Sequence, residues 1–135
     1  IEGERIVLTV PVGATLEQRR RVLELWYREE FRQAIETVRW SLQAEVGREA
    51  AAVSVRWMKT RWGSCNTRTR RINLNLELVK RLPAYFQATF IHELCHLIST
   101  GHGQLFQAQM DRCCPGWRML RRELRYDPIG QSFWE

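Results

Sequence analysis

The pattern of hydrophobic and polar positions divides the chain into a long helical block, a block of short strands and a second helical block. Between residues 16 and 46 the apolar side chains recur at helical spacing. They are Leu16, Leu23, Trp26, Tyr27, Ala34, Ile35, Val38, Leu42 and Val46. Thr15, with Gln18 three residues later, forms a capping-box pattern, and Gly47 is a natural stop. The first block therefore predicts one long helix.

Short alternating stretches predict the strands. Residues 53–58 and 72–76 alternate between apolar and polar positions, and residues 5–10 form a short apolar run closed by Pro11. The polar segment 61–70 between the two alternating stretches is too short for a helical crossover. We therefore expect these two strands to pair in an antiparallel manner.

The second helical block begins at Pro83, which favours the first turn of a helix. Shorter helices are predicted at residues 104–113 and 116–126. A helix, a small sheet and then further helices indicate an α+β fold. The length of 135 residues predicts one domain over residues 1–135.

Composition narrows the class of protein. Hydrophobic residues make up 44% of the chain, but no apolar run is long enough to span a membrane. No secretory signal pattern is present, although the chain starts at Ile1, which leaves open a segment further upstream. The four cysteines include no C-x-x-C pair, and Cys113 and Cys114 are adjacent. We therefore expect reduced thiols and a cytoplasmic protein.

The chain is basic, with a formal net charge of +6. Of its 21 basic residues only Lys59 and Lys80 are lysines, so the surface is rich in arginine. Arginine suits the recognition of phosphate and carboxylate groups, which makes weak association with nucleic acid one hypothesis. The alternative is a set of solvated helix faces carrying pairs such as Glu24 and Arg28.

The chemistry-bearing residues are concentrated in one window. All three histidines of the chain, His92, His96 and His102, lie within eleven residues, and the first two frame the pattern H-E-x-x-H. On a helix, side chains four positions apart project from the same face. Two imidazoles on one face provide half of a tetrahedral zinc site, and His102 provides a third ligand if the chain turns back at Gly101 and Gly103.

This window predicts a catalytic Zn²⁺ site that keeps a fourth position for water. Glu93 follows the first ligand and is placed to accept a proton from that water, so we expect hydrolysis of peptide bonds. Asp111 is the rival third ligand. A purely structural site would need a fourth side chain, for which Cys65 is a candidate.

Three blocks of the chain resemble the YgjP-like metallopeptidase domain, a family in the zincin clan related to SprT-like and WLM proteases. The blocks are Arg61-Trp62-Gly63-Ser64-Cys65, then Ile72-Asn73-Leu74-Asn75, then His92-Glu93-Leu94-Cys95-His96 with His102 four residues before Phe106. Their order and spacing follow the family pattern R-W-G-S-C, I-x-L-N, H-E-L-x-H and a histidine before an aromatic.

The resemblance implies a zincin-like fold, in which a small mixed sheet is combined with a long backing helix, an active-site helix and short C-terminal helices. It implies zinc at His92, His96 and His102 with Glu93 as general base. It also places the segment 61–65 near a cleft whose edge strand pairs with a peptide. Within these blocks Arg61 and Asn73 are candidates for contacts with substrate or oxyanion; their alternatives are an arginine in an ion pair and an asparagine that holds a turn.

Three functions thus stay open at this stage. The first is a cytoplasmic zinc metallopeptidase acting on peptides or proteins. The second is a nucleic-acid-associated protease of the SprT-like kind, which would use the arginine-rich surface. The third is an interaction module that zinc stabilises without catalysis.

Overall fold

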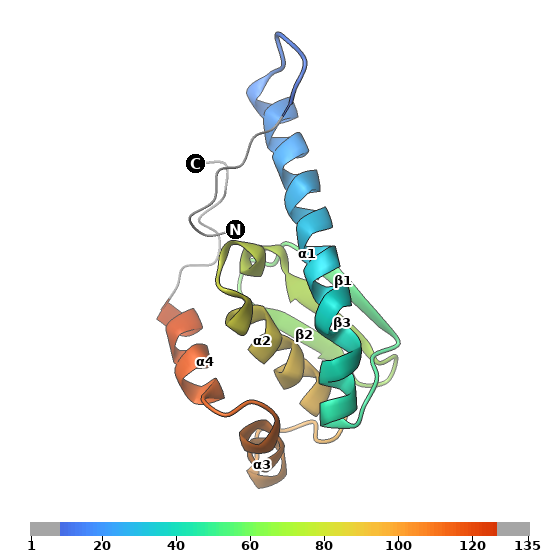
Figure 1. Cartoon of the computed structure of the whole chain (residues 1–135). Coiled ribbons are helices and arrows are strands. Elements are labelled where there is room, and N and C mark those ends of the chain that lie inside the picture. Colours follow the sequence, from blue (N-terminus) through green and yellow to red (C-terminus); the bar gives the residue numbers. More distant parts are fainter. Residues whose placement is uncertain (1–8, 127–135) are drawn as a thin grey trace.

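The computed structural model describes residues 9–126, which form a three-stranded sheet with helices packed against it (Figure 1). The elements in chain order are α1 (Leu16–Val46), β1 (Ala52–Arg56), β2 (Gly63–Asn66), β3 (Arg71–Asn75), the 3₁₀ helix η1 (Leu76–Lys80), α2 (Pro83–Cys95), α3 (Gln104–Cys113) and α4 (Trp117–Tyr126). This arrangement confirms the predicted α+β class with a small mixed sheet, a long helix and short C-terminal helices.

Helix α1 has the bounds that its sequence predicts. The Thr15 hydroxyl accepts a hydrogen bond from the Gln18 amide (3.1 Å), and the Gln18 side chain accepts one from the Thr15 amide (2.8 Å). At the other end Gly47 adopts a left-handed conformation, with φ 87°, and donates to the Gln43 carbonyl. Both ends are fixed by local capping, which is why the pattern alone located them.

The buried face of α1 is narrower than the apolar pattern suggested. Tyr27, Phe31 and Ile35 are buried against the sheet and α2, and Phe31, which the pattern did not include, is fully buried. Leu16 was part of the apolar pattern, but 65% of it is exposed. The first turns of α1 extend beyond the rest of the described residues, so an apolar side chain there has nothing to pack against (Figure 1).

The predicted antiparallel pairing of the two alternating stretches is wrong. The strand order is β1-β3-β2, and β1 pairs with β3 in a parallel manner, with Val53 opposite Ile72 and Val55 opposite Leu74. The polar segment between them contributes β2, which pairs antiparallel with β3 so that Ser64 lies opposite Asn73. The connection leaves β1, passes beyond the position of β3 and returns as a hairpin, so no helical crossover is needed.

The connection between β1 and β2 is held by one buried side chain. Asn75 is fully buried, and its amide donates hydrogen bonds to the carbonyls of Met58 (2.8 Å) and Arg61 (2.7 Å). Its oxygen accepts a bond from the Glu77 amide at the start of η1 (3.1 Å). Because buried backbone groups need partners, Asn75 fixes a loop that has no regular structure of its own.

Helix α2 is the central element of the fold. Pro83 stands in its first turn, and the helix contacts α1, β2, β3, α3 and α4. Phe90, Leu94 and Cys95 on α2 are fully buried. The helix ends at Cys95, and His96 is its C-cap residue in a right-handed helical conformation. The position of the last turn of α2 is therefore fixed by the packing of the core.

The remaining predictions fall into two groups. The predicted helices at 104–113 and near 116–126 are confirmed by α3 and α4. The predicted strand at 5–10 lies largely outside the described residues, and Thr9 and Val10 are not in a strand.

Within the described range, every helix is too short or too polar to cross a bilayer. The four cysteines are free thiols.

Candidate metal centre

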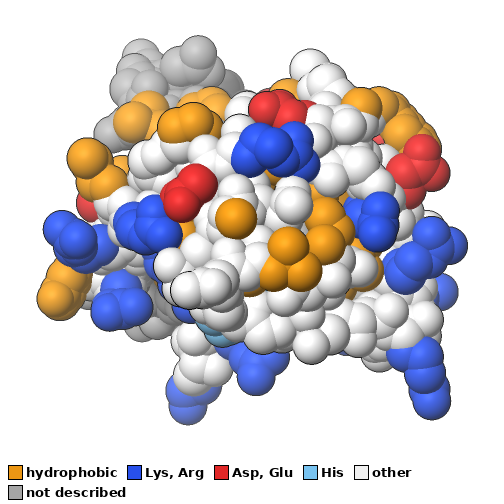
Figure 2. Space-filling view, turned by 90° about the horizontal axis from the view of Figure 1, so that it is seen from below, with side chains coloured by type: hydrophobic (Ala, Val, Ile, Leu, Met, Phe, Trp, Pro, Cys, Tyr) orange, Lys and Arg blue, Asp and Glu red, His pale blue; other side chains and the backbone are white. Residues whose placement is uncertain are grey.

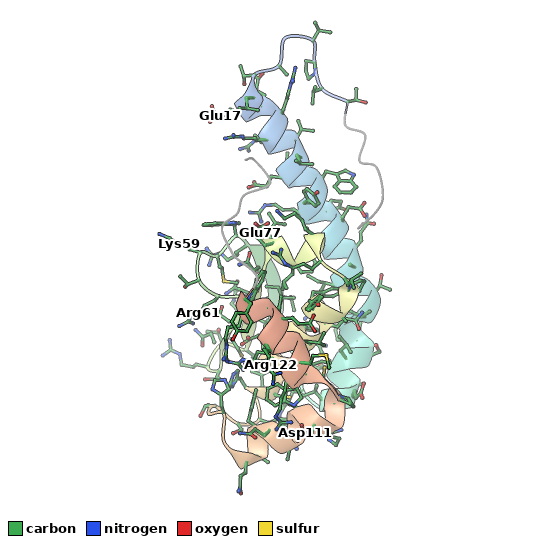
Figure 3. The ribbon with its side chains drawn as sticks, turned by 90° about the vertical axis from the view of Figure 1, so that its left-hand side faces the viewer. Glu17, Lys59, Arg61, Glu77, Asp111 and Arg122 are labelled. Atoms are coloured by element: carbon green, nitrogen blue, oxygen red, sulfur yellow. The ribbon has the colours of Figure 1, made fainter. Side chains whose placement is uncertain are left out.

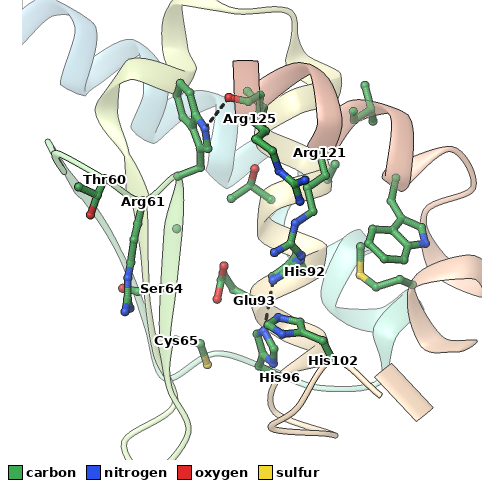
Figure 4. Close-up of a pocket in the computed structure, with 18 of the residues that line it drawn as sticks. Thr60, Arg61, Ser64, Cys65, His92, Glu93, His96, His102, Arg121 and Arg125 are labelled. Atoms are coloured by element: carbon green, nitrogen blue, oxygen red, sulfur yellow. Dashed lines mark hydrogen bonds between the residues drawn. The ribbon is translucent and has the colours of Figure 1, made fainter. Parts of the chain in front are cut away.

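The last turn of α2 and the loop that follows it bring the three histidines together (Figure 4). Their candidate ligand atoms all lie within 4.8 Å of one another, and Nε2 of His92 lies 3.2 Å from Nε2 of His96. His102 reaches the group because the chain turns between α2 and α3, with Gly103 as the N-cap of α3. The turn uses no left-handed glycine at positions 101 and 103.

One aromatic ring supports all three imidazoles. Phe106, on the first turn of α3, is fully buried. Its ring is stacked on His96, with centroids 4.7 Å apart, and meets His92 and His102 edge-on at 4.9 Å each. A ring in this position limits the orientations that the imidazoles can adopt, so the cluster is preorganised by packing.

The hydrogen bonds of the imidazoles form a chain. Arg121 on α4 lies 3.3 Å from Nδ1 of His92, and since a guanidinium only donates, this Nδ1 accepts. Nε2 of a neutral His92 then carries the proton and donates to His96, whose Nδ1 donates to the Ser99 carbonyl at 3.1 Å. A metal held by His92 would be bound through one of its ring nitrogens, and this chain of hydrogen bonds would then have to rearrange.

The protonation states of two of the imidazoles suit metal binding. Burial lowers the pKa of His92 to about 3, and the positive charge of Arg121 adds to this effect. Burial also lowers the pKa of His96. Neutral imidazole is the form that binds a metal ion, so both side chains are in the binding form at neutral pH. Three nitrogen donors on one side of a cleft fit a transition metal such as zinc.

Glu93 lies beside the histidines and is itself buried, with 6% of its surface exposed. Burial raises the pKa of its carboxyl to about 7, while the nearby positive charges of Arg121 and Arg61 act in the opposite direction. Gly63 on β2 lies directly opposite. A Cβ atom at this position would stand 3.1 Å from a Glu93 carboxylate oxygen and 2.9 Å from the Thr89 methyl. Glycine at position 63 therefore makes room for Glu93.

The cluster lies in a cleft of about 860 Å³. Its floor consists of His92, Glu93, His96 and His102. We call its two sides the β2 wall, formed by residues 59–65 and Thr67, and the α4 wall, formed by the side chains of α4 that face the floor. Near one end the two walls are joined by a hydrogen bond from the Trp62 indole to the Leu124 carbonyl, at 3.1 Å (Figure 4).

Two other ligand candidates from the sequence, Asp111 and Cys65, do not belong to the histidine group. The metal-ligating group found among the described residues consists of the three histidines, without Asp111 or Cys65. The Asp111 carboxylate accepts hydrogen bonds from Trp117 (2.9 Å) and Arg118 (2.5 Å). Cys65 lines the cleft, and burial, with a smaller effect of Glu93, raises the pKa of its thiol to about 11.

The two candidate substrate contacts are placed differently. Arg61 lines the cleft. Asn73 is not among the lining residues, and its amide donates to the Ser64 hydroxyl across the β2–β3 pair (3.2 Å). The sequence reasoning missed Arg121 and Arg125, which line the α4 wall. Their spacing on a predicted helix was a visible signal, but nothing in it indicated which element that helix faces.

A small α+β frame with a histidine cluster and a buried carboxylate in a cleft is the framework of a metal-dependent peptidase. The family comparison gives the same answer over most of the chain. Residues 1–127 match the model of the YgjP-like metallopeptidase domain, and the chain belongs to this family. The resemblance seen in the sequence is thereby confirmed, and a metal-dependent protease is the general class of function.

One solved structure with a similar fold was found. The crystal structure of the metallopeptidase zymogen of Pyrococcus abyssi abylysin is similar with a TM-score of 0.61 and 18% sequence identity. The match covers 70% of this chain and 96% of that chain. At this identity the likeness shows a shared metallopeptidase fold. No curated protein matches the chain.

Proposed function

We propose that the protein is a zinc-dependent peptidase in which His92, His96 and His102 hold the metal. The observation that carries the proposal is the convergence of three imidazoles, with ligand atoms within 4.8 Å, beside the buried carboxylate of Glu93. Catalytic zinc sites typically have three protein ligands and a free position. A non-catalytic module would need a fourth protein ligand, and the group among residues 9–126 has three members.

In this proposal Glu93 moves the proton. Zinc, when bound, supplies Lewis-acid polarisation of the substrate carbonyl and lowers the pKa of water. Glu93 accepts the proton of the attacking water and passes it to the leaving amine. Gly63 leaves the space in which the carboxylate is held, and Phe106 holds the imidazoles.

The β2 wall is suited to an extended peptide. β2 is one of the two edge strands of the sheet, since the strand order is β1-β3-β2, and its residues Gly63, Ser64 and Cys65 line the cleft. An edge strand can pair through its backbone with an added strand. Arg61, on the same wall, stays our candidate for contact with the substrate backbone or the developing oxyanion.

The test is the variant Glu93→Gln, which keeps the shape of the side chain and removes its basicity. We expect zinc content, measured by mass spectrometry, to stay at one equivalent while hydrolysis of a casein-derived peptide mixture falls by about 10²-fold or more. Glu36→Gln, an exposed position on α1, is the matched control and should keep full activity. Undiminished hydrolysis by a zinc-loaded Glu93→Gln protein would contradict the proposal.

A further inference from the structure

The charges that line the cleft are strongly unbalanced. Lys59, Arg61, Arg121 and Arg125 line it, and Glu93 on the floor is the one acidic residue among the described lining residues. Figure 2 shows more Lys and Arg side chains than Asp and Glu side chains on the face seen from below. Positive charge therefore predominates both on this face and among the residues that line the cleft.

On the α4 wall the arginines form a stripe. Arg118, Arg121, Arg122 and Arg125 are spaced at i, i+3, i+4 and i+7, which places them on one face of the helix. All four are exposed, and they also line a second, smaller hollow together with His102 and Trp117. Arg118 is paired with Asp111, but no carboxylate of residues 9–126 forms an ion pair with the other three.

The β2 wall adds positive charge from the opposite side. Lys59 and Arg61 lie on the loop beside α4, as Figure 3 shows, and both are exposed. Neither side chain has an ion pair with any carboxylate in the described part of the chain. The loop itself is fixed, because Asn75 holds the Arg61 carbonyl at 2.7 Å. Basic side chains therefore stand on both sides of the floor.

The aromatic residues of the cleft argue against a nucleic acid as the partner. Single strands bind by stacking bases on exposed aromatic faces. Trp62 is covered by the guanidinium of Arg81, 4.7 Å from its ring, and Trp117 is covered by that of Arg118 at 4.5 Å. Both indole N–H groups are also used in hydrogen bonds. The cleft thus offers cations for an anion, while each of its two tryptophans already has a guanidinium on one ring face.

We propose that the cleft selects peptides with acidic side chains on both sides of the scissile bond, an inference that rests on the proposed function. Like charges gathered in a cleft focus a positive potential, and an acidic peptide relieves it while the edge of β2 aligns the backbone. Arg121 and Arg125 on one wall and Lys59 and Arg61 on the other are the groups that recognise the carboxylates.

The experiment measures binding and not turnover. Zinc-loaded Glu93→Gln protein is titrated into a labelled ten-residue peptide with Asp and Glu flanking the central bond, and into its Asn and Gln counterpart. Fluorescence anisotropy should show about tenfold tighter binding of the acidic peptide, as expected for a few partly exposed ion pairs. The difference should shrink between about 0.1 M and about 1 M NaCl, where the screening length falls from about 10 Å to about 3 Å.

Matched variants locate the effect. Arg121→Gln combined with Arg125→Gln should reduce the preference to about twofold or less. Arg19→Gln combined with Arg21→Gln removes the same charge from exposed positions on α1 and should preserve it. If the cleft double variant does not fold, as judged by circular dichroism, Arg125→Gln alone together with the salt titration decides the question.

Two results would overturn the inference. Equal affinity of the Glu93→Gln protein, with both walls unchanged, for the acidic and the amide peptide would show that the basic walls do not select acidic side chains. Tighter binding of a single-stranded oligonucleotide of equal charge, lost in the cleft double variant, would assign the walls to nucleic acid. Because binding is measured on a hydrolytically silent variant, loss of the proposed peptidase function would leave this result interpretable, and the two fail separately.

Discussion

The floor and the walls of the cleft are built on opposite principles. On the floor, Glu93 is almost fully buried and Phe106 packs against every imidazole. On the walls, Arg61, Arg121 and Arg125 are exposed and keep long, flexible side chains. Packing fixes geometry, whereas exposed charge sets a potential without fixing a position. The comparison suggests that the floor performs the chemistry and the walls choose the substrate.

Metal removal should have the largest effect and should act on the floor alone. Treatment with 1,10-phenanthroline is expected to reduce peptide hydrolysis to background, and added zinc should restore it. Far-UV circular dichroism should stay nearly unchanged, because the core around Leu94 and Phe106 is closed by apolar packing. Hydrolysis that continues in metal-depleted protein would refute a role for the three histidines in catalysis.

The second largest effect is expected from removal of the Phe106 ring, which packs against the three histidines. Phe106→Ala is expected to lower the free energy of unfolding by about 3–5 kcal/mol, as for other fully buried aromatic residues. Chemical denaturation measures this change, and zinc affinity should fall with it. Leu105→Ala, at the neighbouring position with 54% exposure, is the control and should change stability by less than about 0.5 kcal/mol. Similar losses for both variants would contradict the role of Phe106.

A single methyl group at the boundary between wall and floor should have a smaller effect. Gly63→Ala places a Cβ 3.1 Å from the Glu93 carboxylate and 2.9 Å from the Thr89 methyl, so the carboxylate must shift. A displacement of a fraction of an ångström to about 1 Å predicts a loss of up to about 10²-fold in kcat with zinc content unchanged. Adding Thr89→Ser, which removes the nearest methyl, should restore part of the activity; no recovery would mean that the shift has another cause.

A substitution confined to the wall should have the smallest effect. Arg125→Gln is expected to leave the free energy of unfolding within about 0.5 kcal/mol of the parent, since the side chain is exposed and unpaired with a described carboxylate. KM for an acidic peptide should rise about threefold, with kcat unchanged. Steady-state kinetics separates the two constants, and a fall in kcat alone would show that wall and floor are not independent.

The sequence predicts best what is local. The cap formed by Thr15 and Gln18, the stop at Gly47 and the start of α2 at Pro83 each depend on a few neighbouring residues, and each was located correctly. Likewise, the grouping of His92 and His96 follows from the helical repeat, and the structure brings His102 to them. The assignment of these residues as ligands stays a prediction.

The sequence pattern did not predict the contacts between elements that are distant in the chain. The parallel pairing of β1 with β3 depends on β2, whose four residues Gly63–Asn66 carry too few apolar positions to be recognised as a strand. Arg121 and Arg125 were readable as one face of a helix, but their place in the cleft, with Arg121 beside His92, depends on how α4 packs on α2. The close approach of Gly63 to Glu93 similarly joins two elements that are distant in sequence.

The hydrogen bond from Trp62 to the Leu124 carbonyl ties together residues 62 positions apart. This bond connects the two walls of the cleft. The width of the cleft therefore depends on the position of α4 as much as on the sheet. Tyr85 on α2 donates a hydrogen bond to Glu123 and so also holds α4 in place. A change that loosens this seating, even far from the histidines, would therefore alter how bulky a chain the enzyme admits.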